Sequence, residues 1–473
     1  MITRHTTALF IAVLAGGIPT AQAQPSVKEM SWYMQHAPFK MPDIARTDFP
    51  AKDFRITDYG AVADGHTLCT DAIQKAITAC SAAGGGHVIV PAGRWLTNPI
   101  ELLSNVDLHF EKDAYMQFNP DHSGYPAAGG NRDAVRPPLY SLEQENIAVT
   151  GDGTIDGSGE TWRPVKKEKQ SAEQWQQLQS SGGFLSPDGK IWWPDKEDME
   201  HPNRRPVMVS FVKCKRVLLQ GVLLRNSPKF IFYPVHCTDL VLDHLKVYNE
   251  WWAQNGDGID ISACKRVMIY ACTVNAGDDG ICMKSSGASP DGPALEDIII
   301  AGCTVLRAHG GFVVGSNTDG RMHDIFVSDC YFSGTDVGLR FKSNRGRGGL
   351  VDDIFIQDIN MQNIAREAVL FDTYYEDAPA GVTRKNVTYT DKTPEFRDIH
   401  ISRIDCQGAK TAISITGLPQ MPISNIFFDD VTIHATRGVV ATQCRNIDLQ
   451  HVTLDVTEKP VIQADATAEI KTH

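Results

Sequence analysis

A short unit recurs from about residue 216 to the end of the chain, and it constrains the fold more than any other feature. Each unit has a polar or basic residue, three or four β-forming residues, a few polar residues and a second short strand, as in "KRVMIYACTVNAG" and "RNIDLQHVTLDV". Most units start 21–31 residues after the one before, and one gap of 45 residues holds the insertion "DAPAGVTRKNVTYTDKTPEF". The first apolar position of each unit lies at Val217, Leu240, Val267, Ile298, Ile325, Ile354, Ile399, Ile426 and Ile447.

A unit of this length without a helix cannot bury its own apolar face, but stacked units can, because each strand pairs with its counterpart one coil away. We therefore predict an all-β protein, a right-handed single-stranded parallel β-helix. A β-propeller fits less well, since its blades need roughly 40 or more residues each. Ahead of the repeats, "DAIQKAITACSAAGGGHVIVPAG" predicts a short helix, a glycine-rich turn and a strand. We expect this helix to form an N-terminal cap on the core.

The two ends of the chain and one irregular stretch set the expected boundaries. Residues 1–23 have a basic start, an apolar run and an Ala-Gln-Ala cleavage site, which is typical of a secretory signal peptide. We therefore expect an exported protein, either periplasmic or secreted. Residues 24–53 form an N-terminal extension and residues 54–470 a single β-helix domain. Residues 160–205, rich in Lys, Gln, Trp and Pro, break the rhythm and predict a surface insertion, a candidate wall for a cleft.

Composition narrows the classes of partner and cofactor. The formal net charge of −12 argues against nucleic acid or an anionic membrane as a general partner. Most of the 11 cysteines stand singly inside apolar strand patterns, which favours buried free thiols over disulfides. No cysteine pair has zinc-ligand spacing, so we predict no metal and no cofactor. We expect a monomer.

Acidic residues occur in glycine turns before two of the repeated strands, in "NGDGIDIS" and "AGDDGICMK". Aligning the coils on the glycine before each strand predicts that Asp257 and Asp279 share a column, with backbones about 4.8 Å apart. Asp278 then falls in line with His309. Side-chain alternation points a further set outward from the same sheet, namely Asp260, Lys284, Arg340 and Lys342.

This arrangement predicts acid–base chemistry. Two carboxylates so close cannot both ionise freely, so the pKa of one is raised. A protonated carboxylic acid beside an ionised one is what hydrolysis of a glycosidic bond requires. The competing interpretation is that the Asp residues are Asx-turn formers and that Arg340 and Lys342 are solvated strand residues.

The motifs "NGDG", "GDDG", "AHGGFVVGS" and "RFK", in that order on a predicted β-helix, resemble the signature motifs of glycoside hydrolase family 28, the polygalacturonase group of pectinases. The similarity extends from about Phe54 to the C-terminal coils. It implies a pectin-lyase-like solenoid that hydrolyses pectic polysaccharide containing α-linked galacturonic acid, and the predicted signal peptide makes this an exported hydrolase. The stretches "GTIDGSG" and "RGRGG" resemble bacterial members, which are often exo-acting.

The resemblance also implies a role for each matching residue. Asp278 would be the general acid, and Asp257 with Asp279 would activate the attacking water. His309 would support protonation of the acid. The family is inverting and metal-free, which implies a carboxyl separation wide enough to admit water. Arg340 and Lys342 would bind the sugar carboxylate, and Tyr374 or Tyr375 in "FDTYYE" would serve the substrate as well. Lys284, in the same column as Lys342, and Asn255 complete the predicted substrate-binding residues.

Departures from the family pattern leave the substrate open. Gly256 stands where the family usually has Thr, and Tyr233 stands where many relatives have His. Homogalacturonan, rhamnogalacturonan and xylogalacturonan all fit, and the action is endo or exo. A Ca-dependent pectate lyase is an alternative in which the three Asp residues hold Ca²⁺. A non-enzymatic carbohydrate-binding surface is another, and it needs only aromatics such as Trp192, Trp193, Trp251 and Trp252.

Overall fold

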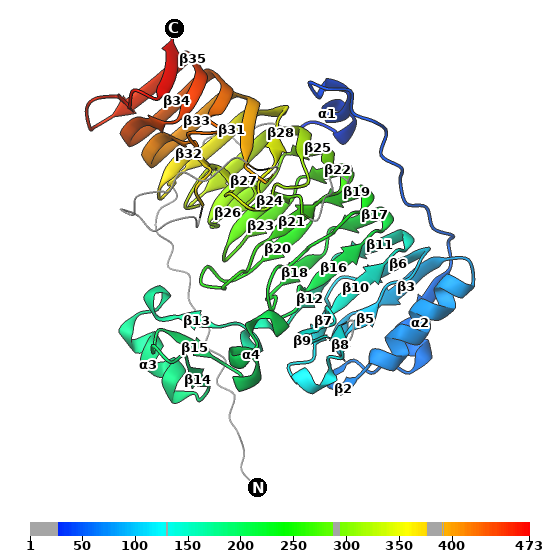
Figure 1. Cartoon of the computed structure of the whole chain (residues 1–473). Coiled ribbons are helices and arrows are strands. Elements are labelled where there is room, and N and C mark those ends of the chain that lie inside the picture. The colour runs from blue at the N-terminus through cyan, green and yellow to red at the C-terminus, as the bar shows by residue number, and fades with distance from the viewer. Residues whose placement is uncertain (1–26, 129–130, 287–293, 376–389, 391) are drawn as a thin grey trace.

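The computed structural model describes residues 27–128, 131–286, 294–375, 390 and 392–473. Parallel strands stack coil upon coil along one axis, and the chain advances steadily from one end of the stack to the other (Figure 1). The predicted right-handed parallel β-helix is confirmed. The predicted signal peptide lies outside the described residues.

Three parallel ladders run along the solenoid, one on each side of the core. The first contains β1 (Asp53–Arg55), β3 (Gly86–Val90), β6 (Val106–Phe110), β11 (Glu145–Gly151), β17 (Lys215–Gln220), β19 (Thr238–Asp243), β22 (Lys265–Tyr270), β25 (Leu295–Ala301), β30 (Leu350–Val351) and β37 (Ala468–Thr472). The second contains β2 (Asp64–Leu68), β4 (Gly93–Thr97), β7 (Ala114–Phe118), β12 (Thr154–Asp156), β18 (Leu223–Arg225), β20 (Lys246–Tyr248), β23 (Thr273–Asn275) and β26 (Thr304–Leu306).

The third ladder matters most for function. It contains β5 (Ile100–Glu101), β10 (Leu139–Leu142), β16 (Val209–Val212), β21 (Ile259–Ser262), β24 (Asp279–Lys284), β27 (Gly310–Val314), β29 (Leu339–Lys342), β32 (Glu367–Asp372) and β36 (Ile462–Ala464). Near the C-terminus, longer strands turn the corners and join two or three ladders each: β28 (Met322–Ser333), β31 (Ile354–Gln362), β33 (Glu395–Thr416), β34 (Ile423–Thr442) and β35 (Cys444–Val456).

The core of the solenoid is built from apolar columns, in the register that the sequence predicts. Along the third ladder each inward side chain lies above its counterpart on the previous coil, so apolar surface is removed from water along the whole length of the stack. One such column contains Ile259, Ile281, Phe312, Leu339, Val369, Ile413, Val439 and Ile462. The neighbouring column begins with Ile261, Met283, Val314 and Phe341.

Two helices cover different parts of the solenoid. The predicted cap is α2 (Thr70–Ala82), which closes the first coil by burying Ile73 and Ile77 in the main core. The N-terminal extension contains a further helix, α1 (Met30–His36), which the sequence did not indicate. It lies on the outer face of the first ladder, against an apolar patch that includes Phe326. The Tyr33 hydroxyl of α1 donates to Asp329 at 2.9 Å and anchors the segment.

The predicted insertion forms a small lobe beside the solenoid (Figure 1). A capping box of Ser171 and Gln174 starts its main helix, and its aromatic side chains pack on Trp252 of the solenoid. Its elements are β13 (Val165–Lys166), α3 (Ala172–Ser180), β14 (Phe184–Leu185), β15 (Ile191–Trp193) and α4 (Lys196–Glu200), with 3₁₀ turns at Gly159–Thr161, Lys167–Lys169 and Pro202–Arg204. The remaining small elements are the hairpin β8 (Ala127–Ala128) and β9 (Asn131–Val135) and the 3₁₀ turns Ile56–Tyr59 and His122–Gly124.

All 11 cysteines are free and buried, as the sequence predicts. Burial raises the pKa of the Cys406 thiol to about 12, so this residue serves as a small apolar side chain rather than as a reactive group. Among the described residues, no helix is both long enough and apolar enough to cross a membrane.

Candidate active site

Asp257 and Asp279 lie side by side where two neighbouring coils enter the third ladder. The amide of Gly258 donates to the carbonyl oxygen of Asp279 at 2.9 Å, which confirms the predicted column. The glycines that follow the two Asp residues leave no room for a side chain, since a Cβ on Gly258 would lie 2.7 Å from the carbonyl oxygen of Gly280. The Asp-Gly pairs therefore allow adjacent coils to approach closely and hold the two carboxylates together.

Asp278 and His309 form a second contact across the coils. The amide of His309 donates to the carbonyl oxygen of Asp278 at 2.7 Å, and the ring Nδ1 lies 2.9 Å from Oδ1 of the carboxylate. The side chain of Asp278 is 24% exposed, whereas those of Asp257 and Asp279 are only 5% and 2% exposed. One oxygen of each of the three carboxylates lies within 4.8 Å of the others. The structure thus brings together the four residues predicted for catalysis.

Two cations on β29 hold Asp279 as an ionised carboxylate. Arg340 Nη1 donates to Oδ1 at 3.0 Å, and Lys342 Nζ donates to Oδ2 at 2.6 Å. Burial alone would raise the pKa of Asp279, but the charges of Lys342 and Arg340 outweigh burial and bring it below its ordinary value. Both cations are buried, so they are not ordinary solvated strand residues.

In contrast to Asp279, Asp257 lies in surroundings that disfavour its ionised form. Burial, together with repulsion from Asp260 and Asp278, raises its pKa well above the ordinary value. Among the described residues, its one cationic neighbour within ion-pair distance is Lys284, whose Nζ lies 3.5 Å from Asp257 Oδ2 and 3.0 Å from Asp260 Oδ1. The Oδ1 atom of Asp257 is buried and accepts no hydrogen bond from the described protein groups. Of Asp257 and Asp279, Asp257 is therefore the one whose pKa is raised. The family resemblance instead implies that Asp278 is the protonated group, the general acid.

Tyr375, rather than Tyr374, lies against the basic side chains of β29. Lys342 Nζ is 4.8 Å from the centroid of the Tyr375 ring, and the Arg340 guanidinium is 5.6 Å from it. The Tyr374 ring is mostly buried and faces Arg345 at 5.7 Å. An aromatic ring and two cations on one surface suit a sugar that carries a carboxylate.

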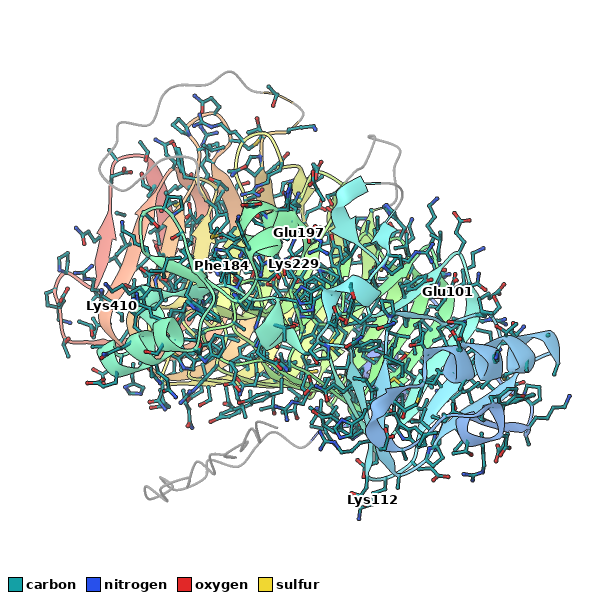
Figure 2. All side chains as sticks on the ribbon, turned by 90° about the horizontal axis from the view of Figure 1, so that it is seen from below. Glu101, Lys112, Phe184, Glu197, Lys229 and Lys410 are labelled. Carbon is teal, nitrogen blue, oxygen red and sulfur yellow. The ribbon has the colours of Figure 1, made fainter. Side chains whose placement is uncertain are left out.

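Asn255 connects the site to the insertion. Its side-chain oxygen accepts a hydrogen bond from Arg205 Nη2 at 3.0 Å, and the Arg205 guanidinium lies 5.8 Å from the Trp193 ring. Lys229 appears in the middle of the molecule in Figure 2. Burial and the charge of Arg205 lower its pKa. The region around Asp257 is therefore basic on this side as well.

Some residues of the site were not predicted. Alternation predicts an outward side chain for Asp260, which is not among the predicted site residues, and the structure places its Oδ1 atom 3.0 Å from Lys284 Nζ. Lys169 of the insertion lies 3.4 Å from His309, between Nζ and the ring Nε2. The insertion has no repeat, so no register in the sequence could have placed this lysine.

The carboxylate cluster is already balanced by protein cations, which bears on the calcium alternative. Lys284, Arg340 and Lys342 each lie within 3.5 Å of a carboxylate oxygen of the site. A calcium site needs six to eight oxygen ligands around a cation of charge two. Three ammonium and guanidinium groups inside the cluster compete with such an ion for the same oxygens.

Comparison with known proteins identifies the family of the chain. An exo-poly-alpha-D-galacturonosidase from Dickeya chrysanthemi is 27% identical over 396 residues, covering 77% of this chain and 64% of the relative. An endo-polygalacturonase from Pectobacterium parmentieri is 26% identical over 366 residues, covering 75% of this chain and 84% of the relative. The crystal structure of a hyperthermoactive exopolygalacturonase from Thermotoga maritima superposes with a TM-score of 0.72 at 26% identity, covering 87% of this chain and 94% of that one. Residues 166–454 match the glycosyl hydrolases family 28, so the chain belongs to that family.

Proposed function

We propose that the protein is an exported polygalacturonase that cleaves α-linked galacturonic acid chains with inversion, from one end of the chain. The observation that carries the proposal is the contact between Asp278 and His309, 2.9 Å long, beside an Asp279 that two cations keep ionised. One accessible carboxyl group backed by a histidine, and one fixed carboxylate, supply the acid and the base that glycoside hydrolysis needs. The names of the relatives support the substrate class.

Membership of a glycoside hydrolase family decides between the three classes of function that the sequence left open. A lyase needs a base that removes a proton beside the carboxylate, and a binding surface needs no acid–base set at all. Neither alternative accounts for the opposite pKa shifts of Asp257 and Asp279. Paired carboxyl groups whose pKa values are driven apart are typical of general acid–base catalysis.

In the proposed mechanism Asp278 donates a proton to the oxygen of the leaving sugar, because it is the most exposed of the three carboxyl groups. Asp279 is the ionised base, and Asp257 lies beside it to orient the attacking water. Water attacks the anomeric carbon as the glycosidic bond breaks, and its proton passes to the carboxylates. Arg340, Lys342 and Tyr375 then face the sugar carboxylate, which competes with Asp279 for the two cations.

Inversion at the anomeric carbon is expected if water, rather than a carboxylate of the protein, attacks the sugar. The oxygens of Asp279 are held by Arg340 and Lys342, and Asp257 is buried and disfavoured as an anion. Neither is suited to attack the sugar directly, which supports water as the nucleophile. The spacing of at most 4.8 Å between carboxylate oxygens is nevertheless closer than the wide separation implied by the resemblance. It is also shorter than the roughly 6.5–9.5 Å that usually separates the carboxyl groups of inverting enzymes. The anomeric form of the product is therefore a direct test of the proposed inversion.

We propose exo action because the insertion reaches the site. Lys169 contacts His309, and Arg205 contacts Asn255, so the lobe lies beside the coils that carry the carboxylates. A wall at this position would stop a long polymer from passing through and would favour cleavage at a chain end.

A time course on a defined oligogalacturonide tests these points together. We expect hydrolysis without added Ca²⁺ and in the presence of EDTA, with only monomer or dimer as the early product. We expect the first product in the proton NMR spectrum to be the β-anomer, because inversion of an α-linkage gives β. A ladder of product sizes would refute exo action, an α-anomer would refute inversion, and activity only on rhamnogalacturonan or xylogalacturonan would reassign the substrate.

Export is proposed from residues 1–23, which have the charge and apolar pattern of a signal peptide. We expect the protein made in a bacterial host to appear outside the cytoplasm with a new N-terminus at Gln24. Mass spectrometry of periplasmic and medium fractions measures this directly. Retention of the intact N-terminus in the cytoplasm would contradict export.

A further inference from the structure

A histidine and two carboxylates converge where the insertion lobe meets the solenoid, on the side of the lobe that carries α4 (Figure 1). His122 lies in the 3₁₀ turn that follows β7, whereas Asp195 precedes α4 and Asp198 lies within it. One ligand atom from each of the three residues lies within 4.8 Å of the others. His122 is far from the two Asp residues in the sequence, so no local motif indicates this cluster.

The hydrogen bonds around His122 determine which ring nitrogen carries the proton. The Thr161 hydroxyl donates to the carbonyl oxygen of Ser158 at 2.8 Å, so its oxygen can only accept from His122. His122 Nε2 lies 3.1 Å from that oxygen and therefore holds the proton. Nδ1 of the neutral ring is then a bare lone pair, the form in which histidine binds a metal ion. The Trp162 ring stacks on the imidazole with centroids 3.4 Å apart and holds it in this orientation.

The lone pair of His122 faces a buried carboxylate. The side chain of Asp198 is fully buried, and its Oδ2 lies 3.1 Å from His122 Nδ1. Although the two atoms are this close, neither has a hydrogen-bond partner among the described protein groups. Two acceptors that face each other away from water repel, and leaving them unpaired costs free energy. A cation bound by both atoms removes this cost, because it accepts a lone pair from each.

The donor set favours zinc. Zn²⁺ binds histidine nitrogen and carboxylate oxygen at about 2.0–2.2 Å, so tetrahedral ligand atoms lie roughly 3.3–3.5 Å from each other. The 3.1 Å between His122 Nδ1 and Asp198 Oδ2 is close to this spacing. Ca²⁺ and Mg²⁺ prefer oxygen ligands, whereas imidazole suits zinc. Arg204 contacts Asp198 through the other oxygen, Oδ1, at 3.3 Å, so it does not occupy the position of the ion.

A pocket of about 500 Å³ gives an ion access to this cluster. His122 lines the pocket, and the charged residues of the lining are Asp121, Glu160, Asp195, Glu197 and Arg204. Four carboxylates and one guanidinium give the pocket a negative potential, which attracts a divalent cation from solution. The site of catalysis differs in this respect, because three cations lie within ion-pair distance of its carboxylates.

We propose that His122, Asp195 and Asp198 bind one zinc ion, with a water molecule from the pocket as the fourth ligand. The ion ties the insertion to the solenoid, because His122 comes from the solenoid and the two Asp residues come from the insertion. The end of the insertion carries Arg205, which donates to Asn255 at 3.0 Å beside the catalytic residues. Zinc therefore holds the lobe in place and takes no part in bond cleavage, so hydrolysis continues in EDTA.

Calorimetric titration of the purified, EDTA-stripped protein with zinc chloride tests the site, and we expect one saturable binding event. His122→Gln and Asp195→Asn should each weaken zinc binding by roughly 100-fold or more, since losing even an outer partner of a metal ligand costs about 10–100-fold. Asp195→Asn is expected to fold, because its amide oxygen can still accept from the Asp198 amide, as Asp195 Oδ1 does at 3.1 Å. Circular dichroism of each variant checks the fold.

Two control variants distinguish this site from other places where zinc could bind. His451→Gln removes a histidine that lies 2.8 Å from Asp429 on the exposed surface, and it should leave the zinc affinity within about 2-fold, as expected for a surface pair. Asp278→Asn alters the catalytic cluster and should also leave the zinc affinity unchanged. Loss of zinc binding in either control would assign the ion to that place and overturn the proposal.

Limited trypsin digestion measures whether zinc ties the lobe to the solenoid. At a zinc concentration 100 times Kd, opening of the site becomes about 100-fold rarer. Cleavage within residues 160–205 that requires the lobe to detach should therefore slow by about this factor in the unmodified protein but not in His122→Gln. No saturable zinc binding, unchanged affinity in Asp195→Asn, or the same rate of cleavage with and without zinc would each overturn the proposal. None of these outcomes depends on the reaction that the protein catalyses.

Discussion

Replacing Asp278 with Asn is expected to lower kcat by roughly 10²–10⁴-fold, the usual contribution of general acid–base catalysis. The amide has almost the same shape as the carboxyl group but cannot donate the proton to the leaving oxygen. Its oxygen still accepts a hydrogen bond from His309, whose Nδ1 lies 2.9 Å away. Because the side chain is partly exposed, we expect the thermal unfolding midpoint to change little. Single-turnover kinetics and circular dichroism on the same preparation measure both quantities.

The chain offers a matched control for this substitution. Asp455 contacts His434 with an Oδ2–Nδ1 distance of 3.0 Å, a similar pair on the exposed surface of the C-terminal coils. Asp455→Asn should leave kcat within about 2-fold of the unmodified protein, because surface pairs of this kind contribute little. If Asp278→Asn retained more than a tenth of kcat, Asp278 would not be the acid, and Asp257, whose pKa is raised, would take its place as the candidate.

The register of the third ladder could be predicted because two independent features of the sequence indicate the same alignment of the coils. Apolar residues alternate along each strand, and a slip by one residue would turn every apolar side chain to the opposite face. The glycine after Asp257 and the glycine after Asp279 mark the same point on adjacent coils, and the structure pairs them as expected. These two signals were sufficient to align Asp278 with His309 from the sequence alone.

Other features depended on contacts that carry no periodic signal. Lys169 lies in a non-repeating lobe, so its contact with His309 required the three-dimensional path of the insertion. The N-terminal helix α1 packs on the outer face of the solenoid through scattered apolar residues. For Asp260, alternation along the strand correctly predicted that the side chain points outward from the core. It did not predict that the side chain is buried, because this burial accompanies an ion pair with Lys284.

Replacing Phe341 with Ala is expected to destabilise the protein by about 3–5 kcal/mol, the usual cost of removing a buried aromatic ring. The ring is fully buried, stacks on Phe371 with centroids 4.4 Å apart, and contacts Phe312 at 6.2 Å. Phe341 also stands between Arg340 and Lys342 on β29, so a cavity beneath it loosens both cations that hold Asp279. We therefore expect kcat/KM to fall by roughly 10-fold or more even at temperatures where the protein remains folded, since small displacements of positioning groups are costly.

Phe428→Ala separates stability from function in this experiment. Phe428 is 1% exposed in the core of β34, among the C-terminal coils, and has no part in the carboxylate cluster. Its removal should lower the unfolding free energy by a similar 3–5 kcal/mol or so, while leaving kcat/KM within about 2-fold at a temperature where the protein is folded. Denaturant unfolding and initial rates on both variants give the comparison. Equal loss of activity in Phe341→Ala and Phe428→Ala would mean that activity follows global stability alone, and that the core beneath β29 does not set the position of Arg340 and Lys342.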